Sequence, residues 1–118
     1  MAPFMSQMKV LQNAVTTVNH NVNRPAEVMH IAGYDRVVLA VTGTAGTMKL
    51  QAEVSMDGTN WIEVGAIQLA DGVNKTAATG IVAVGAYEVP VAGFVSFRTF
   101  LSSVSGTTLT VKATAFPR

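Results

Sequence analysis

The chain has 118 residues, a formal net charge of +1 and no cysteine, which suits one domain and is too short for two. The missing cysteines exclude a disulfide scaffold, a cysteine-ligated zinc site and a thiol nucleophile. The near-neutral charge gives no basic surplus for nucleic acid, and no apolar run is long enough to span a bilayer. Because Met1-Ala2-Pro3-Phe4 lacks the basic and apolar regions of a signal peptide, we expect synthesis in the cytoplasm.

Charged residues make up only 13% of the chain, hydrophobic residues make up 49%, and the mean hydropathy is +0.37. An ordinary soluble domain carries about 25% charged residues. A surface with so few charges is expected to expose apolar area that a partner covers. The alternative is that Thr, Ser, Asn and Gln solvate the surface, and the oligomeric state in dilute buffer distinguishes the two interpretations.

The first 25 residues differ in composition from the rest and are expected to form an N-terminal arm. Residues 10–22 suit either a first strand that completes the fold or a segment that docks on a neighbour, with a short helix as the lesser option. For residues 1–9 the adaptable Met and Phe side chains favour docking. The candidate partner-binding residues of the arm are Phe4, Met5, Met8, Val10 and Leu11.

The composition after the arm favours strands, because Val (18 residues) and Thr (13 residues) far outnumber Leu (6 residues). Residues 36–42 and 94–101 are more continuously apolar than the alternating segments, as in central strands or in strands whose second face meets another subunit. Residues 47–56 alternate strictly, so one face is predicted to be core and the other wet. The predicted core positions are Met48, Leu50, Ala52, Val54 and Met56.

The remaining strands are short and separated by glycine-containing turns. Asp57-Gly58 closes a hairpin into residues 61–64. Residues 81–91 contain a strand that breaks at its proline, and the strand at 108–115 alternates again. Seven or eight such strands predict an all-β domain over residues 26–118. Its architecture is a two-sheet antiparallel sandwich, either immunoglobulin-like or a small jelly roll.

Titratable groups are too few and too scattered to predict an active site. The residue types of a catalytic triad are present in Ser55, His30 and Asp57. However, no characteristic spacing links them, and the sequence has no nucleophile elbow. His20 and Glu27 with His30 lack a recognised metal-ligand spacing. Potential oxygen ligands for calcium are Asp57, Asn60, Asp71 and Asn74. Since these residue types are also typical of turns, we expect no enzyme activity, no metal and no cofactor.

Aromatic side chains are the candidate platform for a carbohydrate or a base. They are Tyr34, Trp61, Tyr87, Phe94, Phe97 and Phe100. A lone Trp directly after a hairpin turn is typical of a core plug, so Trp61 is predicted to tuck inward between the sheets. Residues 55–61 look like a shortened form of the sialidase Asp-box, Ser-x-Asp-x-Gly-x-Thr-Trp. This pattern indicates a turn in which Asp57 bonds backbone amides, and it does not imply glycosidase activity.

Four motifs follow one another along the chain. They are Gly33-Tyr34-Asp35-Arg36-Val37-Val38-Leu39, Val54-Ser55-Met56-Asp57-Gly58-Thr59-Asn60-Trp61, Gly85-Ala86-Tyr87-Glu88-Val89 and Phe94-Val95-Ser96-Phe97-Arg98. With the final Thr-rich strand, they resemble the small β-sandwich virion proteins of tailed bacteriophages over about residues 25–116. That group has Val-Arg where this chain has Phe97-Arg98, and Ser-Asp-Asp-Gly where it has residues 55–58. The positions with an expected structural role are Tyr34, Asp57, Gly58 and Trp61.

The resemblance implies a head decoration protein, also called a capsid cement protein. Such a protein is a non-enzymatic component of the outer surface of the virion head, and it bridges capsid subunits through apolar surface and here through its arm. The expected partners are the major capsid protein and further copies of the chain, as a dimer or trimer, without nucleic acid or membrane. The alternative is a carbohydrate-binding module or a fibre, neck or tail component of the virion.

Overall fold

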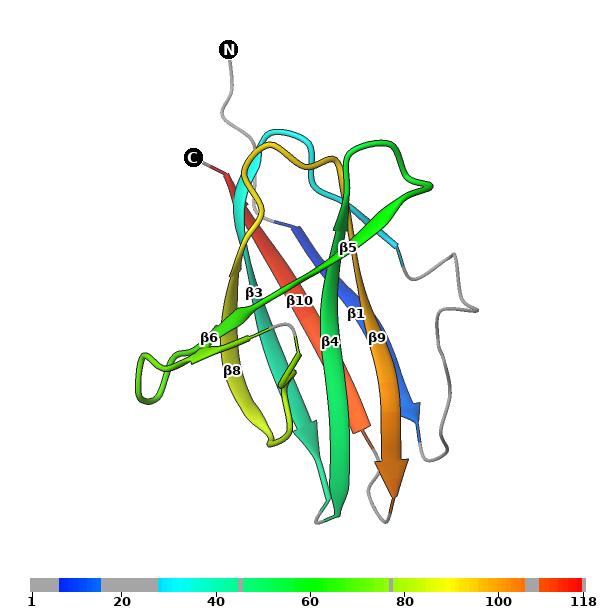
Figure 1. The fold of residues 1–118 in the computed structure, drawn as a ribbon, viewed down its shortest axis with the longest axis vertical. Coiled ribbons are helices and arrows are strands. Elements are labelled where there is room, and N and C mark those ends of the chain that lie inside the picture. Colours follow the sequence, from blue (N-terminus) through cyan, green and yellow to red (C-terminus); the bar gives the residue numbers. More distant parts are fainter. Residues whose placement is uncertain (1–6, 16–27, 45, 77, 106–108, 118) are drawn as a thin grey trace.

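The computed structural model describes residues 7–15, 28–44, 46–76, 78–105 and 109–117, and the structural statements below concern these residues. Within them, ten strands form two antiparallel sheets that lie face to face as two layers (Figure 1). The predicted all-β sandwich of two antiparallel sheets is therefore confirmed.

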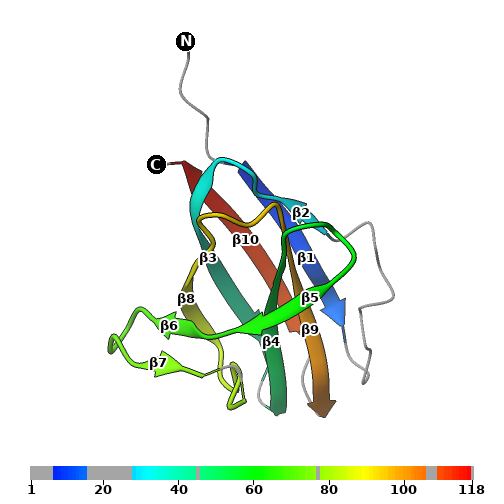
Figure 2. The same cartoon turned by 45° about the horizontal axis from the view of Figure 1, so that its top comes forward.

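The larger sheet has six strands in the order β1-β10-β3-β8-β6-β7. Their bounds are β1 Gln7–Val15, β3 Tyr34–Gly43, β6 Ala66–Gln68, β7 Asn74–Lys75, β8 Gly85–Pro90 and β10 Leu109–Pro117. β3 pairs with β10 on one side and β8 on the other, so the central strand predicted at 36–42 is confirmed. The β6–β7 hairpin projects from one side of the sandwich (Figure 2).

The smaller sheet has four strands in the order β2-β9-β4-β5. Their bounds are β2 Met29–His30, β4 Thr47–Ser55, β5 Trp61–Val64 and β9 Ser96–Ser105. The long central ladder between β4 and β9 runs from Thr47 opposite Ser105 to Ser55 opposite Ser96. Ile81 forms a single antiparallel bridge with Leu50. The strand predicted at 81–91 is thus shorter, since β8 covers only its second half.

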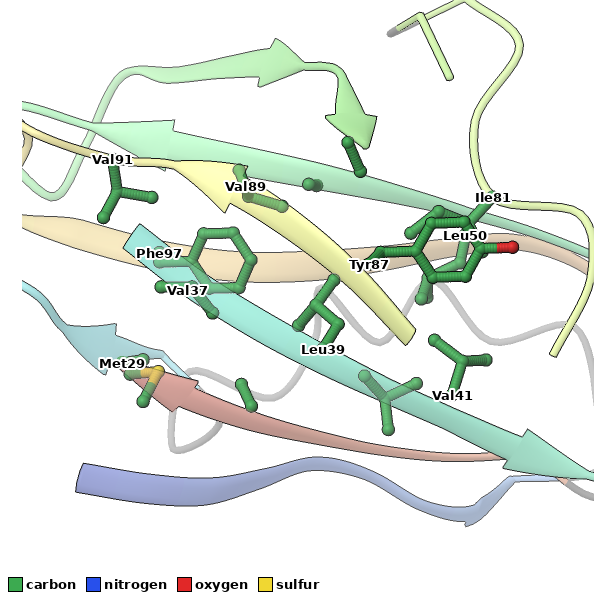
Figure 3. Close-up of a cluster of buried hydrophobic side chains, with 14 of the residues drawn as sticks. Met29, Val37, Leu39, Val41, Leu50, Ile81, Tyr87, Val89, Val91 and Phe97 are labelled. Carbon is green, nitrogen blue, oxygen red and sulfur yellow. The ribbon is translucent and has the colours of Figure 1, made fainter. Parts of the chain in front are cut away.

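Alternate side chains of both sheets fill the space between the layers (Figure 3). β3 contributes Val37, Leu39 and Val41, and Phe97 and Leu50 face them from the smaller sheet. The other fully buried large side chains are Met29, Ile31, Ile81, Tyr87, Leu101 and Leu109. This period-two pattern is the one expected for strands with one face on a core.

The strand at 47–56 departs from its prediction at two points. Met48, Leu50, Ala52 and Val54 face the core as predicted, but β4 ends at Ser55 and Met56 is 68% exposed at the start of the following turn. The opposite face, predicted to be wet, is largely buried, because Gln51, Glu53 and Ser55 are at most 8% exposed. Arg98, which lies opposite Glu53 in the β4–β9 ladder and bonds to it, contributes to this burial.

The predicted arm is partly a strand. β1 pairs with β10 through the backbone over residues 7–15, so this part of the chain belongs to the sheet and the predicted free arm over 1–9 is shortened. Arm residues Met8, Val10 and Leu11 lie in this strand. The unpaired edge of β10 offers hydrogen-bonding groups to any extended segment beside it, which favours this pairing. Phe4 and Met5 lie outside the described residues.

Candidate interaction surface

The outer face of the six-stranded sheet carries a group of apolar side chains, here named the apolar band: Val38, Ala40, Ile67, Leu69 and Ala86. Ala40 lies opposite Ala86 in the β3–β8 ladder, and Glu88 of β8 lies between Val38 and Ile67. The Leu69 amide donates a hydrogen bond to the Ala86 carbonyl, and the Leu69 side chain is 47% exposed. Ala40 and Ala86 are also exposed. The band therefore crosses β3, β8 and the end of β6.

The band exists because β3 is apolar on both of its faces. Val37, Leu39 and Val41 are buried in the core, while Val38 and Ala40 between them point the other way. An antiparallel sheet that faces water normally places polar residues at such outward positions. A central strand that is apolar on both faces fits a sheet whose outer face is covered by another protein.

Charged groups lie beside the band and are weakly paired. Arg36 and Glu88 are 3.9 Å apart, with side chains 50% and 30% exposed. The Arg36 guanidinium also lies 5.1 Å from the centre of the Phe116 ring. Lys112 is exposed on β10 opposite Ala40. An exposed pair at this distance contributes little to stability, so these charges remain available to a partner.

A groove of about 410 Å³ opens at one end of the band. Its lining residues are Ala40, Val41, Thr42, Gly43, Val84, Gly85 and Ala86. The groove forms because four of these residues are Gly or Ala, so little side chain rises above the ends of β3 and β8. Its lining is predominantly apolar, and it holds no cluster of titratable groups. Such a groove suits an apolar side chain of a partner better than it suits a reaction.

The outer face of the four-stranded sheet is organised differently, around the side chain of Arg98. Its Nε donates a hydrogen bond of 2.7 Å to Glu53 Oε1, and its guanidinium lies 4.1 Å from the centre of the Trp61 ring. Arg98 is on β9 and Trp61 is on β5, so the arginine side chain crosses the intervening strand β4. We attribute the burial of Glu53 and Ser55 on this strand to that crossing.

The prediction that Trp61 tucks into the core is wrong. Trp61 lies directly opposite Ser55, whose neighbour Val54 points into the core, so Trp61 points to the outer face. It is half-buried there under Arg98. Trp61 therefore holds the outer face of the smaller sheet together through a cation–π contact and does not fill the space between the sheets.

The turn between β4 and β5 is held by hydrogen bonds to Asp57, as predicted. Asp57 Oδ1 accepts from the backbone amides of Thr59 and Asn60, both at 2.8 Å, and from the Ser55 hydroxyl at 3.0 Å. Bonds from Asn60 and Thr59 hold the pKa of the Asp57 carboxyl well below its usual range. Gly58 has φ +79°, a conformation that residues with a side chain rarely adopt. Hydrogen bonds to Asp57 and the positive φ of Gly58 therefore define the conformation of this turn.

Three exposed apolar side chains, here named the end cluster, lie beside this turn: Met56, Ile62 and Val95. The Val95 amide donates to the Ser55 carbonyl, which places Val95 across from Met56. Ile62 lies opposite Val54, two residues before Met56. The end cluster is at the opposite end of the sandwich from the groove, as the courses of β3, β4 and β8 in Figure 1 show.

The other residues that the sequence singles out have contacts within the fold and do not form a reactive site. Tyr34 is half-buried and packs against the core. Tyr87 is buried and donates a hydrogen bond to the Ala83 carbonyl, and burial together with the charge of Asp71 raises its pKa. Ser55 and Asp57 are hydrogen-bonded to each other, but β9 separates them from His30 on β2. The residues considered for a catalytic triad therefore do not assemble into one.

Among the residues that the structure describes, no group of three or more His, Asp or Glu side chains is placed to hold a metal ion. The described part of the chain also has no helix that could cross a membrane.

Sequence reasoning missed the specific residues of the apolar band and the Arg98 cluster. A signal for the band was present, because residues 36–42 are apolar at both alternating positions and Ala86 continues that pattern on β8. No comparable signal marked Arg98 and Glu53, which are 45 residues apart and meet only through the β4–β9 register.

Comparisons with known proteins place the chain in a family. The model of the XepA family matches residues 10–115, which is nearly the whole chain. No curated protein sequence matches it. Among solved structures, the SPBc2 prophage-derived protein YomS has a TM-score of 0.79 at 12% identity, over 98% of this chain and 95% of that chain. The PBSX exported protein XepA has a TM-score of 0.80 at 17% identity, over 94% of this chain and 37% of that chain.

These matches differ in what they establish. The two solved structures are distant in sequence, so they show a shared sandwich fold. YomS matches this chain along almost its whole length, whereas this chain spans little more than a third of XepA. The family model rests on the sequence and covers the β-sandwich together with most of β1. This chain belongs to the XepA family.

Proposed function

We propose that this chain is a non-enzymatic structural protein of a phage particle, and specifically a head decoration protein that bridges capsid subunits. The observation that carries the proposal is the apolar band, a partly exposed apolar surface on the larger sheet in a protein with only 13% charged residues. When a partner covers the band in the particle, apolar area is removed from water. This burial contributes about 25 cal/mol of favourable free energy for each Å².

The family supports a phage setting. YomS is described as prophage-derived, and XepA is described as an exported protein of PBSX. A component of the outer surface of a particle also ends outside the cell, which agrees with export. Within this proposal the major capsid protein and further copies of this chain are the partners, and Phe4 and Met5 of the N-terminal arm add contacts. Many identical weak contacts on one shell act in parallel, so a modest single interface is sufficient.

The aromatic side chains do not favour the carbohydrate-binding alternative. Tyr87 is buried, and the Arg98 guanidinium covers the Trp61 ring at 4.1 Å. A sugar that stacked on this face of Trp61 would have to displace Arg98 from both Trp61 and Glu53. The apolar band is therefore the better-supported binding surface.

The proposal is tested by measuring binding to purified heads of the phage that encodes this chain, after the native copies have been removed. Val38→Arg places a charge in the band, and Val82→Arg makes the same change at an exposed valine outside it. We expect Val38→Arg to weaken binding about tenfold or more, because the charge must be buried on docking. Val82→Arg is expected to bind like the unchanged protein.

Thermal unfolding of both variants ensures that the comparison concerns binding and not folding. Equal binding of Val38→Arg and the unchanged protein would remove the band from the mechanism. Absence of any binding by the unchanged protein to heads, together with binding to purified tails or necks, would move the protein to another part of the particle.

A further inference from the structure

Aspartate is followed by glycine at two places in the chain, Asp57-Gly58 and Asp71-Gly72, and both pairs lie in exposed turns. In such a pair the backbone nitrogen of glycine can attack the carboxyl carbon of the aspartate and close a cyclic imide, the succinimide. Glycine favours this reaction because it has no side chain to hinder the approach. The two turns therefore have the same potential chemistry, and their surroundings decide whether it occurs.

The carboxyl group of Asp57 is held in its ionised form. Besides the bonds to Oδ1 described above, the Asn60 side-chain amide donates to Asp57 Oδ2 at 2.7 Å. Bonds from Asn60 and Thr59 hold the pKa of Asp57 well below its usual range. A carboxylate is a poor target for a nitrogen nucleophile, because ring closure must expel one of its oxygens as water. The Asp57-Gly58 turn is therefore protected although it is exposed.

The carboxyl group of Asp71 is held by fewer bonds. Among the described residues, the Val73 amide donates to Asp71 Oδ1 at 2.9 Å and makes the single hydrogen bond of that carboxyl group. Val73 follows Gly72, so this bond keeps the carboxyl group on the Gly72 side of the turn. Gly72 has φ +72°, and no atom lies within 4 Å of the place where a side chain would be. The Asp71 turn therefore has open space for ring closure.

The two glycine amides do not account for a difference between the turns. The Gly72 amide donates to the Gln68 carbonyl at 2.7 Å, and the Gly58 amide donates to the Ser55 hydroxyl at 2.8 Å. Either bond must open before the nitrogen can attack. The contrast between the turns consequently lies in the carboxyl groups.

We propose that Asp71-Gly72 is a site of spontaneous conversion to isoaspartate in the folded protein, and that the bonds to Asp57 protect Asp57-Gly58. In the first step a bond forms between the Gly72 nitrogen and Asp71 Cγ, and the amide hydrogen leaves with a carboxyl oxygen as water. In the second step water adds to the main-chain carbonyl carbon of Asp71 and breaks its bond to the nitrogen. The main chain then runs through Cγ, and water is the only other reactant.

The conversion changes the β6–β7 hairpin, because isoaspartate adds one methylene group to the main chain. Two backbone bonds close this turn, from the Gly72 amide to Gln68 and from the Gln68 amide to the Val73 carbonyl. Both depend on the main-chain length at Asp71. Leu69 of the apolar band lies in the same turn, so the conversion also alters one side of the band. This last consequence rests on the proposed function, whereas the conversion does not.

The conversion is measured by incubating the protein at neutral pH in water enriched in heavy oxygen, because each passage through the succinimide incorporates one oxygen atom from water. Cleavage after glutamate, in ordinary water, places Asp57 and Asp71 in separate peptides. Mass spectrometry then follows each site. We expect the Asp71 peptide to gain heavy oxygen about tenfold or more faster than the Asp57 peptide, since the acid form of Asp57 is depleted.

Two controls separate the effect of the fold from that of the local sequence. In urea the bonds to Asp57 are absent, so we expect both peptides to gain heavy oxygen at similar rates. Asp71→Glu keeps the charge but requires a larger ring, so its peptide is expected to stay unlabelled. Equal labelling of Asp57 and Asp71 in the folded protein, slow labelling of Asp57 in urea, or persistent labelling in Asp71→Glu would each overturn the proposal.

The consequence for binding is tested with purified heads, using protein enriched in the converted form and Asp71→Glu protein incubated for the same time. Circular dichroism verifies that both are folded. We expect the converted form to bind more weakly, and equal binding would contradict an effect on the apolar band. If freshly prepared protein does not bind heads, the proposed function fails, while the labelling of Asp71 is measured without any partner and stands separately.

Discussion

The outer faces of the two sheets use charge in opposite ways. On the smaller sheet, Arg98 and Glu53 meet at 2.7 Å with side chains only 24% and 11% exposed, and Trp61 lies against the arginine. On the larger sheet, Arg36 and Glu88 are 3.9 Å apart with side chains 50% and 30% exposed. One face satisfies its polar groups internally, whereas the other leaves apolar side chains and loosely paired charges at the surface.

The difference shows where the few charges of this protein act. The smaller sheet uses a charge pair to hold its own strands together, so the charges of Arg98 and Glu53 on its outer face have little left to offer a partner. The larger sheet needs its charges less for stability, and its apolar band remains uncovered in the described structure. A low charge content therefore does not expose all surfaces equally, and the larger sheet is the one expected to bind.

The largest effect on stability is expected from Glu53→Gln. Removing this carboxylate leaves the Arg98 guanidinium partly buried without its charged partner, and we expect a loss of about 2 kcal/mol in the free energy of unfolding. The matched change Glu88→Gln on the larger sheet is expected to cost less than about 0.5 kcal/mol. Urea unfolding measures both. Equal losses of unfolding free energy in Glu53→Gln and Glu88→Gln would contradict the proposed difference between the two outer faces.

A smaller effect is expected from Arg98→Lys, which keeps the charge but loses the flat guanidinium that lies on Trp61. We expect a loss of about 1 kcal/mol, since lysine does not reproduce a stacked arginine. Trp61 is the only tryptophan, so its fluorescence reports the contact directly. The control Arg36→Lys acts on the weaker contact with Phe116. It should change neither the free energy of unfolding nor the tryptophan fluorescence. An unchanged tryptophan spectrum in Arg98→Lys would show that the stacking is unimportant in solution.

The smallest effect is expected at the turn that supports the end cluster. Because the pKa of Asp57 is lower in the folded chain than its ordinary value of 3.8, the unfolded chain takes up the proton first as the pH falls. The stability that Asp57 contributes is therefore present above about pH 4 and is lost progressively below it. Urea unfolding at several acidic pH values should show a shallower decline for Asp57→Asn than for the unchanged protein. Asp71→Asn is the control and is expected to decline like the unchanged protein. Identical declines for Asp57→Asn and the unchanged protein would contradict a contribution of Asp57 to the pH dependence of stability.

Much of the fold could be predicted because strand periodicity is a local property. The alternation of Met48, Leu50, Ala52 and Val54 needs only neighbouring residues to be recognised, and so does the turn at Asp57-Gly58. The outward position of Trp61 could not be predicted in this way. It depends on the register that the turn imposes between β4 and β5, and an apolar side chain alone does not reveal that register.

The candidate surface was predictable only as a property of the whole chain. Composition indicated that some apolar surface would remain, but two segments, 36–42 and 94–101, were both candidates for it because both are rich in apolar residues. The structure separates them, because Arg98 of the second segment lies against Trp61 on the outer face, whereas Ala40 of the first is exposed among the described residues. That difference arises from contacts between residues far apart in sequence, such as Glu53 with Arg98.

The central claim is that the outer face of the six-stranded sheet is the docking face. Cryo-electron microscopy of the phage that encodes this chain tests it most directly. We expect density for the sandwich on the head, with Val38 and Ile67 against the capsid shell and Trp61 turned away from it. Density in which the four-stranded sheet faces the shell while the apolar band stays open to solvent would contradict the claim.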